Sequence, residues 1–134
     1  MTAAEGCRDR PQGTVLIVED EVLVRLDLAD QLRSTGLTVL EASNADEALV
    51  VLEAIDGIAL VVSDIRMPGA ADGLDLVGWL RRERPAIKIV LVSEYIGTRR
   101  IFPIADLALA KPIDRALFVR EVRRLLGADH TAAA

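Results

Sequence analysis

The sequence predicts an α/β fold in which helices cover both faces of a five-stranded parallel sheet. Short, continuously apolar segments alternate along the chain with segments whose apolar residues recur at helical spacing. Val, Ile and Leu fill consecutive positions of the short segments, which is typical of strands buried on both faces. The chain has 134 residues, a length that suits one domain with a single core. We therefore expect a three-layer sandwich of alternating strands and helices.

The first part of the domain is expected to contain a strand, a helix and a second strand. Thr14–Val18 is a β-branched run of the kind that forms a buried strand. Val22–Gly36 has apolar residues at helical spacing, and Gly36 is of a residue type that often ends a helix. Leu37–Ala42 then returns to a strand pattern.

A capping signal marks the start of the next helix. Ser43 or Asn44 can cap the segment 45–54, and Asn44 has capping-box spacing to Glu47. The apolar run Ile58–Asp64 predicts the third strand, and it ends in a carboxylate. Burying a charge is costly unless the charge is paired or bound to a metal. The acid at the end of this run is therefore a candidate site residue.

The third helix and the fourth strand are followed by an irregular connection. Gly73–Pro85 predicts a helix that Pro85 ends, and Ile87–Ser93 predicts a buried strand. The connection that follows contains Gly97 and Pro103, which break any long helix. We expect a fourth helix in this region to be short or distorted.

The last strand–helix unit closes the domain. Asp106–Pro112 predicts the fifth strand, and Asp114–Gly127 predicts the last helix with its first residue as the N-cap. The ends of the chain, residues 1–13 and 128–134, read as flexible tails because they are small and polar. The expected organisation is one domain over residues 14–127.

Composition limits the classes of function. The chain is 51% hydrophobic and 28% charged, so a disordered chain is not expected. A net charge of -5 disfavours nonspecific binding to nucleic acid or to an anionic membrane. One cysteine excludes a disulfide within the chain and a cysteine metal cluster. No signal peptide and no apolar run of about 18 residues is present, so we expect a cytoplasmic protein.

Chemically active side chains follow four of the five predicted strands. Glu19 and Asp20 come after the first strand, Asp64 ends the third, Ser93 ends the fourth and Lys111 ends the fifth. Ligands of open α/β sheets bind at the carboxyl ends of the strands, so these groups are expected to meet there. Three carboxylates repel one another, and Mg²⁺, which prefers oxygen ligands, would relieve the repulsion. The lysine and the hydroxyl suit a phosphoryl group, which a carboxylate can accept as a nucleophile.

Four motifs in order, "VLIVEDE", "VVSDIRMPG", "IVLVSEY" and "ALAKPID", resemble the receiver domain of two-component response regulators. The resemblance spans about residues 14–126. It implies a (βα)₅ fold of flavodoxin-like topology and a Lys111–Pro112 peptide bond in the cis form. It also implies a role for each residue at the strand ends. These roles are the phosphoacceptor for Asp64, Mg²⁺ binding for Glu19, Asp20, Asp64 and the backbone carbonyl of Arg66, and contacts to the phosphoryl group for Ser93 and Lys111.

Three features depart from the pattern of that family. The segment between Ser93 and Lys111 is several residues short, in the region of the fourth helix. Ala108 stands where the family often has an aromatic residue that moves on phosphorylation. The loop after the acceptor, "MPGAADG", is one residue longer than the common form. In the family alignment Arg66 and Tyr95 flank the site, and we expect them to tune the lifetime of the phosphoryl group.

The expected function is a single-domain response regulator in a phosphorelay. A histidine kinase or a histidine phosphotransfer protein would phosphorylate Asp64, and a downstream protein target would read the result. An alternative is a receiver-fold interaction module that acts without phosphorylation. A Mg²⁺-dependent phosphohydrolase would need a nucleophile and an acid two residues apart after the first strand, where "EDE" has no Asp-x-Asp. A flavodoxin would need a Ser/Thr/Gly-rich phosphate loop there instead. The domain itself is expected to be regulatory and not an enzyme.

Two surfaces are candidates for partners. The family resemblance implies docking on the first helix and on the loop after the fifth strand. The last helix carries a basic face on an acidic protein, which is either a solvated face or a contact in a dimer or with a partner. We expect a monomer or a weak homodimer. The arginines of this face are Arg115, Arg120, Arg123 and Arg124.

Overall fold

The computed structural model describes residues 13–65, 73–93 and 105–127 of the chain. Within these ranges, five strands form one parallel sheet in the order β2-β1-β3-β4-β5. The elements are β1 (Thr14–Val18), α2 (Val22–Arg33), β2 (Thr38–Ala42), α3 (Ala45–Ala54), β3 (Ile58–Asp64), α4 (Gly73–Glu83), β4 (Lys88–Ser93), β5 (Leu107–Ala110) and α5 (Arg115–Leu126). The predicted five-stranded parallel sheet is confirmed.

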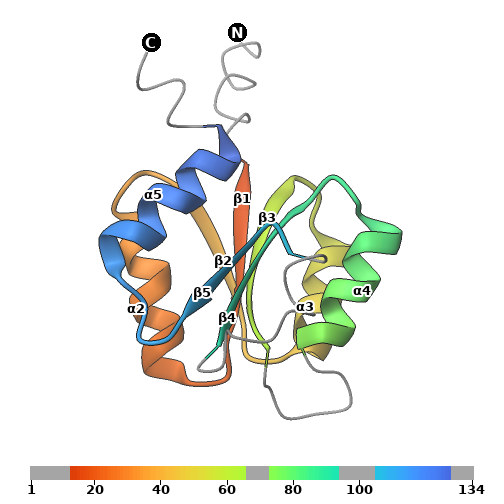
Figure 1. Cartoon of the computed structure of the whole chain (residues 1–134). Helices are drawn as coiled ribbons and strands as arrows, with labels where there is room; N and C mark the ends of the chain where they lie inside the picture. The colour runs from red at the N-terminus through yellow and green to blue at the C-terminus, as the bar shows by residue number, and fades with distance from the viewer. Residues whose placement is uncertain (1–12, 66–72, 94–104, 128–134) are drawn as a thin grey trace, which may run out of the picture.

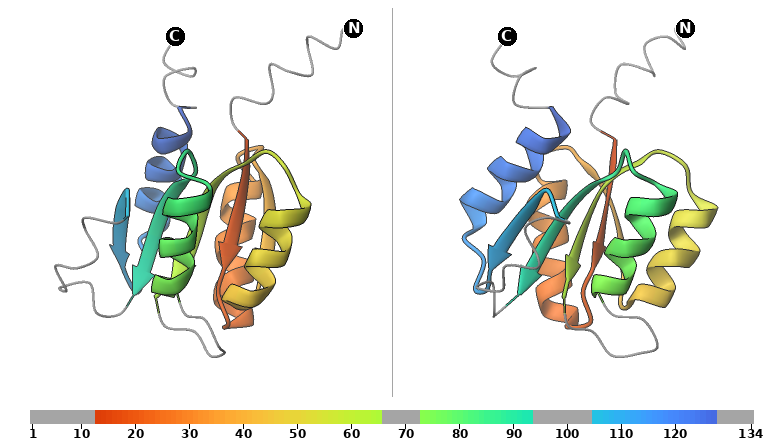
Figure 2. Two further views of the ribbon diagram at one scale, coloured as in Figure 1. Left: turned by 90° about the vertical axis from the view of Figure 1, so that its right-hand side faces the viewer. Right: turned by 45° about the vertical axis from the view of Figure 1, so that its right-hand side comes forward.

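Helices cover both faces of the sheet. The pair α2 and α5 lies on one face, and α3 and α4 lie on the other (Figures 1 and 2). The strands divide their apolar side chains between two core clusters because successive side chains point to opposite faces. Both clusters are almost entirely aliphatic, and Phe118 of α5 is fully buried in the cluster under α2 and α5.

The strand order determines where a site can form. The chain passes from β1 to β2 on one side and then crosses to β3 on the other side of β1. Parallel strands all end at the same edge, which is the lower edge of the sheet in Figure 1. A ligand site of an open α/β sheet lies at that edge, at the point where the strand order reverses.

Side-chain caps start two of the helices as predicted. The N–H of Glu47 donates to Asn44 Oδ1 at 2.8 Å, and the Glu47 carboxylate accepts from the N–H of Ser43 at 2.7 Å. Both candidate cap residues therefore take part, one through its side chain and one through its backbone. Asp114 caps α5 by accepting from the N–H of Leu117 at 2.9 Å. Gly127 ends α5 in the left-handed conformation, with φ at 84°.

Several boundaries differ from the prediction. The last residue of helix α2 is Arg33, and Gly36 ends its final turn as predicted: its φ is 94°, its N–H donates to the carbonyl of Arg33 at 2.9 Å, and the N–H of Leu37 donates to the carbonyl of Leu32 at 3.4 Å. Helix α4 ends at Glu83, because the residue before a proline is disfavoured in a helix. The strands β2, β4 and β5 are each shorter than their predicted ranges. The predicted short fourth helix lies outside the described residues.

None of the helices in the described ranges is both long and apolar enough to cross a membrane.

Candidate metal site at the carboxyl edge of the sheet

Three of the predicted site residues lie close together because successive side chains of a strand point to opposite faces of the sheet and these three point to the same face. Glu19, Asp64 and Lys111 follow β1, end β3 and follow β5, respectively. Each stands two residues after a residue of the core cluster under α2 and α5, so all three share one side of the sheet. The three preceding core residues are Ile17, Val62 and Leu109.

Lys111 bridges two buried acids. Its Nζ lies 3.0 Å from Glu19 Oε1 and 2.7 Å from Asp64 Oδ2. The exposed side-chain fractions are 14% for Lys111, 1% for Glu19 and 10% for Asp64. Carboxylate oxygens of Glu19, Asp20 and Asp64 all lie within 4.8 Å of one another, and Asp20 is exposed to solvent. The site is therefore half-closed: two acids and the lysine lie inside, and one acid lies at the entrance.

The backbone of the acidic turn after β1 is fixed by hydrogen bonds. The N–H of Glu19 donates to the carbonyl of Ala42 at 3.0 Å, and the carbonyl of Glu19 accepts from Arg25 Nη1 at 2.9 Å. Glu19 Oε2 accepts from the N–H of Glu21 at 3.1 Å. The side chain and both polar backbone groups of Glu19 are thus held in place.

The protonation of the site follows from burial and charge. Burial raises the pKa of Glu19, and the charge of Asp64 adds to the effect, against lowering contributions from the Glu21 N–H and Lys111. Burial by itself would lower the pKa of Lys111, but the hydrogen bonds that its ammonium donates to Asp64 and Glu19, together with their negative charges, outweigh burial and raise this pKa. Lys111 therefore stays a cation at neutral pH. It brings one positive charge to three clustered carboxylates, which leaves the cluster suited to a further cation.

The other predicted site residues are described in part. Ser93 is 4% exposed at the end of β4, and its carbonyl accepts from the N–H of Lys111 at 2.9 Å. This bond joins the end of β4 to the residue that carries the lysine. The peptide bond between Lys111 and Pro112 is cis, as predicted. Arg66 and Tyr95 lie outside the described residues, so their roles stay predictions.

Residues that sequence reasoning did not single out support the acidic turn. Arg25 of α2 contacts the Glu19 carbonyl, and its Nε lies 3.1 Å from Glu41 Oε1 on β2. A signal was present, because a positive charge near the start of a helix opposes the helix dipole. Such a residue needs another partner, but the partner 16 positions away becomes visible only in the folded chain.

A groove opens beside the lysine, between α2 and the connection from β5 to α5. Its volume is about 710 Å³, and Lys111 lines both the groove and the acidic site. On α2, the lining residue Leu23 is 81% exposed, and the neighbouring Val22, outside the groove, is 53% exposed. The lining residues are Leu23, Val24, Asp27, Leu28, Gln31, Lys111, Pro112, Ile113 and Arg115.

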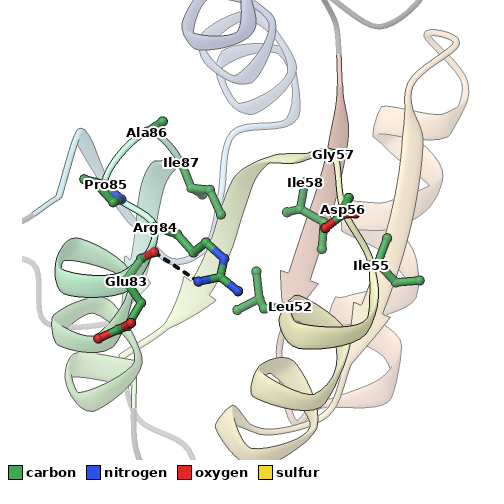
Figure 3. A pocket seen from close by; sticks show the side chains of 10 residues that line it. All are labelled: Leu52, Ile55, Asp56, Gly57, Ile58, Glu83, Arg84, Pro85, Ala86 and Ile87. Atoms are coloured by element: carbon green, nitrogen blue, oxygen red, sulfur yellow. Dashed lines mark hydrogen bonds between the residues drawn. The ribbon is translucent and has the colours of Figure 1, made fainter.

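A second hollow, of about 370 Å³, lies at the opposite edge, where β3 and β4 begin. Figure 3 shows the side chains that line it, among them Leu52, Ile58 and Arg84, whose Nη1 donates to the Glu83 carbonyl at 3.0 Å. This hollow is separated from the acidic cluster by the length of the sheet. It holds no part of the candidate metal site.

The arginines on α5 have partners within the chain. Arg115 Nη2 lies 3.1 Å from Asp27 Oδ1, and Arg124 Nη2 lies 2.7 Å from Glu121 Oε1. Arg123 Nη1 donates to the carbonyl of Thr35 at 3.3 Å. Intramolecular pairing satisfies part of this basic face, which favours the interpretation as a solvated face over a contact surface.

The strand order and the acidic cluster at the edge of the sheet are the features expected of a receiver domain. The model of the family described as response regulator receiver domain matches residues 15–123. The chain belongs to this family. The fold resembles solved receiver domains from Francisella and from Methanospirillum hungatei, each with a TM-score of 0.78, at 21% and 22% identity over 87% and 90% of this chain and 98% of each of those chains.

Relatives with known roles span more than this domain. The sensor kinase CckA of Brucella abortus is 46% identical over 83 residues, which are 61% of this chain and 9% of that protein. The response regulator FleR of Pseudomonas aeruginosa is 36% identical over 119 residues, 84% of this chain and 24% of that protein. The chain thus matches a small part of each relative.

Two solved structures resemble the fold with higher sequence identity. The response regulator TrrA of Thermotoga maritima, in complex with Mg²⁺-BeF, has a TM-score of 0.76 and 30% identity over 84% of this chain and 98% of that one. The receiver domain of the hybrid histidine kinase CckA has a TM-score of 0.71 and 34% identity over 85% and 99% of the two chains.

Proposed function

We propose that this domain accepts a phosphoryl group on Asp64 from a phosphohistidine of a histidine kinase or a histidine phosphotransfer protein, with Mg²⁺ required. The observation that carries the proposal is the contact of Lys111 Nζ with Asp64 Oδ2 at 2.7 Å, beside the carboxylates of Glu19 and Asp20. A carboxylate, a cation and an acidic pair at the edge of a sheet are the groups that such a reaction uses. Relatives named as response regulators and as a sensor kinase support it.

The donor set fits a hard divalent cation. Glu19, Asp20 and Asp64 offer oxygen atoms alone, within 4.8 Å of one another, and oxygen is the ligand type that Mg²⁺ prefers. Burial raises the pKa of Glu19 and the charge of Asp64 adds to the effect, so a bound cation would favour the charged form of this carboxylate. We assign the three carboxylates and the backbone carbonyl of Arg66 as the groups that would hold the ion. A bound Mg²⁺ would supply positive charge next to the phosphoryl oxygens during transfer.

The side chains of the domain have separate tasks in the transfer. A carboxylate oxygen of Asp64 attacks phosphorus, so that a P–O bond forms while the P–N bond to the donor histidine breaks and the imidazole leaves with the bonding electron pair. Lys111 lies against Asp64 and neutralises charge on a phosphoryl oxygen as transfer proceeds. The hydroxyl of Ser93, at the end of the neighbouring strand, donates to another oxygen. Attack of water on phosphorus later returns the free carboxylate and inorganic phosphate.

The groove beside Lys111 is the docking surface in this proposal. A phosphohistidine has to reach Asp64 from the solvent side, and the groove leads from the exposed face of α2 to Lys111. The exposed apolar side chains Val22, Leu23 and Leu26 on α2 suit the apolar face of a partner helix. The partner is accordingly a helical histidine-bearing protein that covers α2 and the start of α5.

Intact-mass spectrometry tests the proposal. The wild type is incubated with acetyl phosphate or phosphoramidate in Mg²⁺ or in EDTA, beside Asp64→Asn and a control, Asp56→Asn, at the opposite edge of the sheet. We expect the mass of one phosphoryl group to be gained by the wild type and Asp56→Asn in Mg²⁺. Asp64→Asn and all EDTA samples should gain nothing. An unchanged gain in Asp64→Asn would refute the assignment, and no gain with any phosphodonor or kinase would refute the function.

A further inference from the structure

The acidic turn is tied to the edge strand of the sheet by an arginine–glutamate pair. We propose that Arg25 and Glu41 are positioning residues that hold Glu19 and Asp20 in the arrangement that binds the divalent cation. The pair does not itself contact the cation. This inference rests on the proposed function of the carboxylate cluster, which it deepens by assigning the groups that set its metal affinity.

Arg25 links the acidic turn to β2 through two hydrogen bonds. Its Nη1 donates to the carbonyl of Glu19 at 2.9 Å, and its Nε donates to Glu41 Oε1 at 3.1 Å. The exposed side-chain fractions are 16% for Arg25 and 20% for Glu41, so both groups are largely shielded from water. A planar guanidinium that bonds through two of its nitrogens fixes direction as well as distance.

The link completes the backbone anchoring of Glu19. Its N–H already donates to the carbonyl of Ala42 on β2 at 3.0 Å. Its carbonyl reaches the same strand through Arg25 and Glu41. Both polar groups of one backbone residue are therefore held by β2, one directly and one through the ion pair. The carboxylates of Glu19 and Asp20 stand on this anchored backbone.

Glu41 also determines which carboxylate the Arg25 guanidinium pairs with. The guanidinium lies next to an acidic turn. Its charge also reaches Glu47 on α3, whose pKa is lowered mainly by the Ser43 N–H and to a smaller extent by Arg25. If Glu41 is neutralised, the acids that remain near Arg25 are Glu47 and those of this turn. The guanidinium would then pair with carboxylates that bind the cation and compete with it. Replacing Glu41 should thus weaken binding of the cation, although Glu41 is not one of the clustered carboxylates.

Arg33 provides a matched control on the same helix. Its Nη1 lies 2.9 Å from the other oxygen of Glu41, and its Nη2 donates to the carbonyl of Val39 at 2.8 Å. Its hydrogen bonds thus join α2 to β2 without including Glu19 or Asp20. Removing Arg33 tests what the loss of an α2–β2 link does by itself.

The test is the Mg²⁺ dissociation constant by calorimetric titration of the full chain. The variants are Arg25→Met, Arg25→Lys, Glu41→Gln and Arg33→Met. Phosphorylation by acetyl phosphate is measured across the same Mg²⁺ series, and unfolding in EDTA reports the stability of each variant. We expect Arg25→Met and Glu41→Gln to raise the dissociation constant by about tenfold, as for partners that orient metal ligands. Arg33→Met should stay within about twofold, Arg25→Lys should lie between, and saturating Mg²⁺ should restore the phosphorylation rate.

Four results would contradict these expectations, and each leads to a different conclusion. Wild-type affinity in both Arg25→Met and Glu41→Gln would overturn the inference while leaving the proposed function intact. An equal loss in Arg33→Met would also overturn it, because the effect would then follow from helix attachment alone. A phosphorylation rate that stays low at saturating Mg²⁺ would show that the pair does not act through metal affinity. Absence of Mg²⁺ binding in the wild type would refute the proposed function itself.

Discussion

Replacing Lys111 with methionine should lower the free energy of unfolding, because it leaves the buried carboxylates of the site without a cation. The substitution keeps a long apolar stem and removes the ammonium group that lies 3.0 Å from Glu19 and 2.7 Å from Asp64. At an effective dielectric constant of about 20, these two contacts correspond to about 5.5 and about 6 kcal/mol of Coulombic attraction. Most of that attraction is offset, because burying the ammonium costs several kcal/mol.

The net effect is therefore set by the two acids left without a cation. Removing one partner of a buried ion pair typically costs about 3–5 kcal/mol, and the exposed Asp20 side of the site argues for the lower end, about 3 kcal/mol. The assay is urea unfolding at pH 7 in EDTA, repeated in Mg²⁺, with the exposed Lys88→Met as the control. Mg²⁺ should stabilise Lys111→Met more than it stabilises the wild type. A loss below about 1 kcal/mol in EDTA would refute the reasoning, since such a value is typical of an exposed pair.

The pKa shifts, the metal, the core and the helix cap lead to further predictions. The raised pKa of Lys111 means that its stabilisation is complete below the ordinary value of 10.5 and is lost as pH rises through the folded-state value. Over that range the stability of Lys88→Met should therefore fall with pH more steeply than that of Lys111→Met, which lacks the titrating group. In the wild type, Mg²⁺ at 100 times its dissociation constant should raise the free energy of unfolding by about 2.7 kcal/mol, and EDTA should remove this increment. Phe118→Ala should cost about 3–5 kcal/mol in urea unfolding, because the ring is fully buried; a loss near 1 kcal/mol would contradict that packing. Asn44→Ala should cost about 1 kcal/mol through loss of the α3 cap, and no change in unfolding would argue against the cap. The lowered pKa of Glu47, caused by the Ser43 N–H, means that its contribution is present above 4.5 and is lost as pH falls through the folded-state value; Glu47→Gln should flatten that part of the stability profile.

The elements of the fold could be predicted because local patterns carry them. The strand β1 and the helix α3 have the predicted bounds, since continuous apolar runs and a capping residue leave few alternatives. Helix ends were less predictable. The residue type of Gly36 indicated the turn that ends α2, but the last helical residue, Arg33, depends on hydrogen bonds of that turn, which apolar spacing does not show.

The sequence by itself determined which residues could meet at the site. Parallel strands end at one edge, so the acids after β1 and β3 and the lysine after β5 had to share it, whatever the details of packing. The tertiary structure decided how they meet. Lys111 contacts both Glu19 and Asp64, which are 92 and 47 positions away in the chain. These contacts form because side chains alternate along each strand and all three point to the face covered by α2 and α5. The link from Glu19 through Arg25 to Glu41 likewise exists only once α2 packs beside β2, since a contact between distant residues depends on how the elements dock and not on the local pattern of either one.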